Sequence, residues 1–157
     1  MFTVGLFCME NFSLDARSTK TLEKKLGIKL SEVAKLNIKE DVILTTAAGE
    51  VLHLPFDAVD EIARPACMAC FDFANDFADV SVGGLGSPDG YTTTVIRTGM
   101  GQKIYNGAKH ARLLKELHFR SAEKGKLHRT ELMAKITAFV RRKKARARAT
   151  LSAARSD

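Results

Sequence analysis

Three cysteines constrain the fold of this chain more than any other feature, because they offer soft ligands from two distant segments. Cys8 stands near the start of the chain, whereas Cys67 and Cys70 form a Cys-x-x-Cys pair. Such a pair supplies two thiolates from one turn of backbone, and a distant third extends the set to three corners of a tetrahedron or of an iron-sulfur cube. The set is one ligand short of a closed site, and the fourth ligand is the main question that the sequence raises.

The Cys-x-x-Cys pair by itself does not identify the chemistry, since redox dithiols, zinc sites and iron-sulfur sites all use it. Zinc usually requires a second Cys pair or a Cys/His pair, and the four histidines show no such spacing. A thioredoxin-like dithiol opens a helix after the first strand, whereas this pair lies in mid-chain after a predicted hairpin. Cys8 is also open to interpretation as a plain buried thiol. No catalytic triad is visible, and we predict no catalytic residue.

The hydrophobic pattern predicts strands and helices in one α/β or α+β domain with a small mixed sheet. Residues 2–7 form an apolar run that reads as a buried strand ending at Cys8, and residues 78–82 and 91–98 read as further strands. Residues 36–54 predict a β-hairpin around Gly49. We expect flanking helices at residues 13–25, capped by Ser13, at 99–117, and at 130–149, the last being long and basic. Ser31 and Glu32 predict another short helix.

A glycine-rich loop connects two of the predicted strands, with four glycines and a proline among the eight residues 83–90. Main-chain amides in such a loop can approach a phosphate or a flavin ring closely, and threonines at its exit add hydroxyls. The loop lacks the Gly-Lys-Ser/Thr ending of a P-loop and the helix that follows a dinucleotide fingerprint. The alternative is a tight connection that binds nothing. The candidate cofactor-binding residues are Gly83, Gly84, Gly86, Ser87, Pro88, Asp89, Gly90 and Thr92.

Most of the net charge of +7 lies at the C-terminus, since residues 141–157 carry +6 and residues 1–140 only about +1. We therefore divide the chain into a domain at 1–140 and a basic helical or disordered tail at 141–157. A solvated tail is the simplest reading, and an acidic protein surface or RNA is the alternative partner. An odd number of cysteines and the lack of a signal peptide favour a reducing cytoplasm. No run reaches the roughly 18 apolar residues of a membrane span.

Five motifs at consistent spacing together resemble one family. They are residues 5–12 (GLFCMENF), 67–72 (CMACFD), 78–83 (ADVSVG), 86–90 (GSPDG) and 94–98 (TVIRT). They resemble the C-terminal half of the beta subunit of coenzyme F420-reducing hydrogenase, a module shared with F420-dependent formate dehydrogenase and F420H2 dehydrogenase. The resemblance runs from residue 4 to about residue 101, and the basic C-terminal helix also has a counterpart.

The resemblance implies an electron-transfer flavoprotein that holds FAD beside one 4Fe-4S cluster and exchanges a hydride with coenzyme F420 as substrate. It makes Cys8, Cys67 and Cys70 ligands of the cluster, and it places the glycine loop at 83–90 near the cluster and flavin. Electrons would pass to partner oxidoreductase subunits of the hydrogenase, formate dehydrogenase or iron-sulfur type. Nucleic acid is then the less favoured partner.

The chain departs from the family because it resembles the C-terminal half alone. The first half of family members carries a glycine-rich flavin-binding segment and a Pro-Cys-Gln element whose cysteine resembles the fourth ligand. We expect that half on another chain, and we do not expect this chain to be active alone. The alternatives are a three-cysteine site that stands by itself, a cofactor-free structural or truncated subunit, and a basic-tailed nucleic-acid-binding module.

Overall fold

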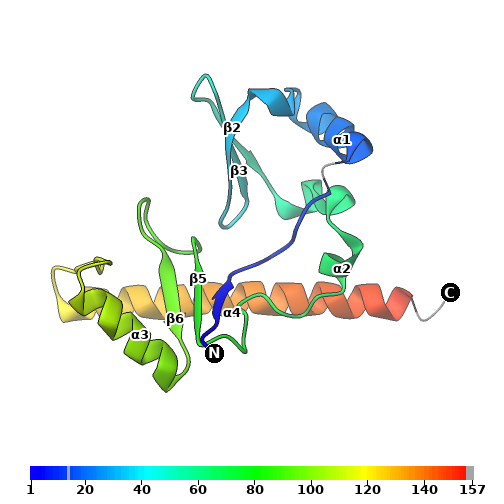
Figure 1. Ribbon diagram of the computed structural model, residues 1–157. Helices are drawn as coiled ribbons and strands as arrows, with labels where there is room; N and C mark the ends of the chain where they lie inside the picture. Colours follow the sequence, from blue (N-terminus) through cyan, green and yellow to red (C-terminus); the bar gives the residue numbers. More distant parts are fainter. Residues whose placement is uncertain (14, 155–157) are drawn as a thin grey trace. The chain divides into compact units, whose positions relative to one another are not determined.

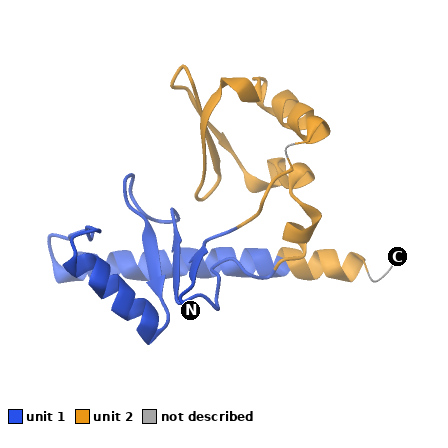
Figure 2. Ribbon diagram, viewed as in Figure 1, with its two compact units in different colours: residues 1–8, 71–145 blue, residues 9–70, 146–157 orange. Residues whose placement is uncertain are grey.

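The computed structural model describes residues 1–13 and 15–154. The chain divides into two compact units, which we call unit 1 and unit 2 (Figure 2). Unit 1 contains residues 1–8 and 71–145, and unit 2 contains residues 9–70 and the chain from residue 146 onward. Two of these divisions follow a cysteine directly, since Cys8 and Cys70 each end a segment of a unit.

Unit 1 is built on a three-stranded mixed sheet of order β1-β5-β6 (Figure 1). β1 (Val4–Leu6) pairs in parallel with β5 (Val80–Gly83), which pairs antiparallel with β6 (Thr93–Ile96). Asp79 fixes the entry to β1, because the backbone N–H and the hydroxyl of Thr3 both donate to its carboxylate at 2.9 Å. Hydrogen bonds from Thr98 and then Thr3 hold the pKa of Asp79 below its ordinary value.

Two helices pack with this sheet, α3 (Gly99–His110) and the part of α4 (Ala122–Ala153) that belongs to unit 1. Phe73 joins α4 to the sheet, because its ring lies 5.5 Å from that of Phe7 and 5.4 Å from that of Phe139. Phe73 is 4% exposed. The core of unit 1 therefore includes an aromatic cluster, one member of which, Phe7, directly precedes Cys8.

Unit 2 pairs an antiparallel sheet of order β2-β3-β4 with short helices. Val42 and Leu44 of β3 are 2% and 0% exposed, and the other buried apolar residues of unit 2 are Met9, Leu22, Phe56, Val59, Ile62 and Ala147. The remaining bounds are α1 (Ala16–Leu26), β2 (Val33–Ile38), β3 (Val42–Thr46), β4 (Val51–Leu54), α2 (Pro65–Met68) and the 3-10 helices at Leu30–Glu32, Phe56–Ala58 and Asp60–Ile62.

The predicted fold class is confirmed, with a mixed sheet, flanking helices, a hairpin and a long C-terminal helix. The predicted hairpin is β3–β4, with Leu44 opposite Leu52 and Gly49 in the left-handed region at φ 87°. The helix predicted at 99–117 is shorter than expected, because α3 ends at His110. Two further local predictions are wrong. The first helix is capped by Asp15, whose carboxylate accepts from the amides of Arg17 and Ser18, whereas Ser13 only donates to that carboxylate.

The second wrong prediction is the short helix at Ser31, because only residues 30–32 turn and residues 33–38 form β2. Pairing with β3 overrides the local capping signal there. At the C-terminus α4 begins earlier than expected and passes through residue 141, where we placed the start of a tail. That division of the chain stays a prediction. No helix among the described residues is long and apolar enough to cross a membrane.

Candidate cofactor site

Cys8 follows β1 in unit 1, and both of its backbone polar groups are held. Its N–H donates to the carbonyl of Phe73 at 2.9 Å, and its carbonyl accepts from Nζ of Lys143 at 2.5 Å. Phe7, one residue earlier, donates to the carbonyl of Val82 at 2.8 Å and keeps the chain on the sheet. A half-buried cysteine therefore follows β1 closely, on a stretch of backbone that hydrogen bonds hold in place.

Cys67 and Cys70 lie on the one-turn helix α2 and just after it, in unit 2. Pro65 opens this helix, where the missing N–H of proline has no cost, and the amide of Cys70 donates to the carbonyl of Cys67 at 3.3 Å. The backbone N–H of Asn11 donates to Sγ of Cys67 at 3.3 Å. Arg64 donates in return to the carbonyl of Asn11 at 2.9 Å. The stretch that follows Cys8 is thereby paired with the stretch that carries Cys67.

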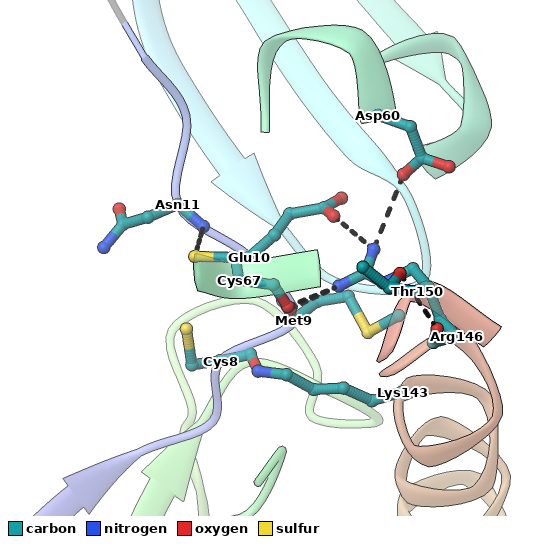
Figure 3. A network of polar contacts seen from close by, with 9 residues as sticks. All are labelled: Cys8, Met9, Glu10, Asn11, Asp60, Cys67, Lys143, Arg146 and Thr150. Atoms are coloured by element: carbon teal, nitrogen blue, oxygen red, sulfur yellow. Dashed lines mark hydrogen bonds and ion pairs between the residues drawn. The ribbon is translucent and has the colours of Figure 1, made fainter. Parts of the chain in front are cut away.

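Arg146 of α4 binds this paired region of unit 2 (Figure 3). Its Nη2 donates to the carbonyl of Met9 at 3.1 Å and to that of Cys67 at 3.4 Å. Its Nη1 forms ion pairs with the carboxylate of Glu10 and, at 3.5 Å, with that of Asp60. One planar guanidinium thus contacts two carbonyls and two carboxylates around the cysteine-bearing segments.

The three predicted ligands are divided between the units, with Cys8 in unit 1 and Cys67 and Cys70 in unit 2. All three side chains are half-buried. Among the described residues, no three His, Cys, Asp or Glu side chains are grouped so as to hold a metal ion. The assignment of the three cysteines as ligands stays a prediction.

The glycine loop is the connection between β5 and β6, and its own hydrogen bonds shape it. The hydroxyl of Ser87 donates to the carbonyls of Gly84 and Tyr91, both at 3.0 Å. Gly86 and Gly90 have φ values of 72° and 82°, which L side chains rarely adopt. A Cβ on Gly86 would lie 2.6 Å from Cδ1 of Leu132, so the loop also touches α4 closely.

A surface pocket of about 780 Å³ in unit 1 opens beside this loop. Of the candidate residues Ser87, Pro88, Gly90 and Thr92 line it, whereas Gly83, Gly84, Gly86 and Asp89 are not among its lining residues. The binding roles of all eight stay predictions. Thr93 and Thr94, two of the threonines that the sequence pointed out at the exit of the loop, also line it. Residues that the sequence did not indicate complete the wall: Tyr91, Tyr105, Leu114, Lys115, Glu116, Leu117, Phe119, His128, Arg129 and Leu132.

A polar cluster on the pocket wall is preorganised by charge. The hydroxyl of Tyr105 donates to Glu116 at 3.0 Å, and Nζ of Lys109 forms an ion pair with the same carboxylate at 2.6 Å. Hydrogen bonds from Lys109 and Tyr105 lower the pKa of Glu116, and burial followed by the bond to Glu116 raises the pKa of Tyr105. Phe119 and His128 add a ring pair at 4.9 Å. The pocket thus offers ring surfaces, a hydroxyl and fixed charges.

Two of the seven basic residues in the predicted tail point into the protein. Lys143 is 1% exposed, and the side chain of Arg146 is 15% exposed. Arg141, Arg142 and Arg148 are exposed, and Arg155 lies outside the described residues. A basic surface for RNA would therefore lack two of the cations that composition assigned to it.

Comparisons with known proteins agree with the resemblance. The family model that describes the C terminus of the beta subunit of coenzyme F420 hydrogenase/dehydrogenase matches residues 1–121, which include all three cysteines and the glycine loop. The beta subunit of the coenzyme F420 hydrogenase of Methanosarcina barkeri is 39% identical over 108 residues, which are 68% of this chain and 37% of that protein. One subunit of the F(420)H(2) dehydrogenase of Methanosarcina mazei is 34% identical over 104 residues, covering 66% of this chain and 30% of that protein.

A solved structure extends the likeness beyond the family model. A chain of the F420-reducing [NiFe] hydrogenase complex from Methanosarcina barkeri matches with a TM-score of 0.69 and 31% identity, over 96% of this chain and 50% of that chain. This chain thus spans half or less of the length of these relatives. It belongs to the family of coenzyme F420 hydrogenase/dehydrogenase beta subunits, in the part that forms their C-terminus.

Proposed function

We propose that this chain is part of an electron-transfer subunit that moves electrons between coenzyme F420 and partner oxidoreductase subunits. Its resident cofactors would be FAD and one 4Fe-4S cluster, the latter held by Cys8, Cys67 and Cys70. The proposal is supported by family membership and by relatives whose names specify F420 hydrogenase and F(420)H(2) dehydrogenase. The reducing cytoplasm is the compartment that suits such thiolates.

The observation that carries the proposal is the amide of Asn11 on Sγ of Cys67. Thiolates that bind iron-sulfur clusters accept backbone N–H bonds, and these bonds help to set the potential of the cluster. The donor set consists of sulfur ligands, which suit iron in a cluster and do not suit a hard cation such as Mg²⁺. The chemistry of the three donors therefore suits the proposed group, although these side chains are not gathered around one point in the described part of the chain, and one ligand would come from elsewhere.

The size and lining of the pocket in unit 1 support the proposal of a planar organic cofactor there. Its volume of about 780 Å³ lies within the range of roughly 300–1,000 Å³ that is usual for small-molecule sites. Leu114, Phe119 and Leu132 offer apolar surface, while Tyr105 and Glu116 offer oriented polar atoms. When bound, FAD and a cluster convert a two-electron hydride into single electrons, which is chemistry that the side chains cannot supply.

A polypeptide partner would complete the protein. Val4 and Leu6 of β1 are 56% and 66% exposed, so the strand that leads to Cys8 presents apolar side chains to solvent. Because this chain covers 50% of the matched hydrogenase chain, we propose that the partner that covers these apolar side chains is the other half of a beta subunit, carried on another chain or on further sequence. That half would bring the fourth thiolate.

Anaerobic reconstitution with ferrous iron and sulfide tests the cluster. We expect the full chain, mixed with the part of the Methanosarcina barkeri beta subunit that it does not match, to retain iron and absorb in the visible range. Cys8→Ser, Cys67→Ser and Cys70→Ser should each lower the iron content, whereas Met68→Leu on the same helix should not. No retained iron, with or without that partner, refutes the cluster and favours a cofactor-free protein.

Flavin binding tests the pocket separately. Titration of FAD with the same mixture, followed by flavin fluorescence, should show binding that Phe119→Ala and Leu132→Ala weaken. Leu113→Ala is the matched control, because Leu113 is 81% exposed and does not line the pocket. Equal affinity in all three variants would remove the pocket from the proposal while leaving the cluster test unaffected.

A further inference from the structure

Two inward-pointing cations on α4, the buried Lys143 and the half-buried Arg146, have a role that the family assignment does not state. Lys143 is among the most completely buried side chains of the described chain, at 1% exposure. Burying an ammonium group is unfavourable unless hydrogen bonds replace its water. A lysine in such a place therefore indicates a specific bonding partner rather than filling of the core.

The partner of Lys143 is the backbone of a predicted ligand. Its Nζ donates to the carbonyl of Cys8 at 2.5 Å within unit 1. The other polar group of the same residue, the N–H of Cys8, donates to Phe73. Because Lys143 and Phe73 together occupy both backbone groups, the cysteine can turn only about its side-chain bonds.

Arg146 does the same for the second cysteine segment, within unit 2. The same nitrogen, Nη2, reaches the carbonyls of Met9 and Cys67, so one rigid group fixes the residue after Cys8 and the ligand residue on α2. The carboxylates of Glu10 and Asp60 hold the guanidinium from its other side. The contacts span 137 residues to Met9 and 79 residues to Cys67, which no local pattern in the sequence would indicate.

We infer that Lys143 and Arg146 are positioning residues that fix the backbone of the cysteine ligands and place positive charge beside them. This inference rests on the proposed function, since the ligands are those of the proposed cluster. It predicts two separable effects. The bonds order the ligand segments before iron binds, and the charges stabilise the reduced cluster, which is more negative than the oxidised cluster.

Hydrogen exchange of the iron-free full chain tests the bonds. In Arg146→Met, we expect exchange at residues 9–11 and 66–68 to accelerate at least about tenfold, the factor that corresponds to one lost charged hydrogen bond. Lys143→Met should act on the amide of Cys8. Arg148→Met is the matched control, because it removes the same charge from an exposed site on the same helix. Unchanged exchange in Arg146→Met, or uniform acceleration over the whole chain, would overturn the inference.

The midpoint potential of the reconstituted cluster tests the charges. Arg146→Met should move the potential to more negative values, whereas Arg148→Met should not. Arg146→Lys separates the two effects: it keeps the charge and hence the potential, but one ammonium does not hold two carbonyls, so exchange still accelerates. A potential that Arg146→Met leaves unchanged refutes the electrostatic part. If the unmodified chain retains no iron either alone or mixed with the partner half, the proposed function fails, and the exchange data alone decide whether the side chains hold these segments.

Discussion

Replacing Phe73 with alanine should destabilise unit 1 strongly. Phe73 is 4% exposed and makes ring contacts with Phe7 and Phe139. A buried Phe→Ala change costs about 3–5 kcal/mol, of which each ring pair contributes about 0.5–1.5 kcal/mol. For a chain of this size, about 2–4 °C of melting temperature is lost per kcal/mol, so we expect a drop of about 6–20 °C.

Phe77→Ala provides a control in the same loop, because Phe77 is 99% exposed. Its effect should stay within about 0.5 kcal/mol. Thermal unfolding followed by circular dichroism measures both variants. Equal melting temperatures for the two variants would show that the aromatic cluster does not support unit 1.

The same pair of variants links the core to the site. The carbonyl of Phe73 accepts the N–H of Cys8, so loss of the ring should loosen the backbone that carries this cysteine. At a temperature where both variants remain folded, we expect the reconstituted Phe73→Ala protein to lose iron faster than Phe77→Ala. Equal rates would mean that the position of Cys8 does not depend on the core.

Three further changes test other parts of the structure. Gly101→Ala places a Cβ 2.5 Å from a main-chain carbonyl oxygen and should lower the free energy of unfolding by about 1–3 kcal/mol. Gly107→Ala in the same helix meets no atom within 4 Å and should raise it by about 0.5–1 kcal/mol; denaturant midpoints measure both changes. Hydrogen bonds from Ser13, Ser18 and Arg17 lower the pKa of Asp15 from 3.8 to about 2, so the contribution of its carboxylate to stability is present above pH 3.8 and is lost as the pH falls toward 2. In Asp15→Asn the melting temperature should therefore vary less with pH over that interval, and an unchanged pH profile would contradict this. Tyr105→Phe removes a hydrogen bond that lowers the pKa of Glu116, so that pKa should rise in a carboxyl NMR titration, and a fall would contradict the geometry.

Local signals in the sequence predicted the elements that local chemistry determines. The alternation around Gly49 gives the β3–β4 hairpin, with Gly49 in the left-handed region. Prediction failed where two local signals competed. Ser13 and Asp15 are both good caps, and the structure uses the carboxylate, whose two oxygens accept from the backbone and from Ser13 together.

The site depended on contacts that no window of sequence contains. Arg146 and Lys143 were counted as surface charge, because a run of basic residues does not reveal that its partners lie at residues 8–10. The sequence indicated only the glycine-loop side of the pocket wall, since Tyr105 and Glu116 come from segments that carry no motif. The cysteines and the glycine loop were visible because their residue types are unusual and closely spaced.

The long helix α4 lies beyond the residues that the family model matches but mostly within the structural match. The family model ends at residue 121, which by itself would leave all of α4 outside the family. The structural match covers 96% of this chain and therefore necessarily includes most of the residues after 121. Most of α4 is solvent-exposed, and a few inward side chains, among them Phe139, Lys143 and Arg146, contact the rest of the protein. Substitution of those three positions should therefore lower the melting temperature more than substitution of all the exposed arginines of α4.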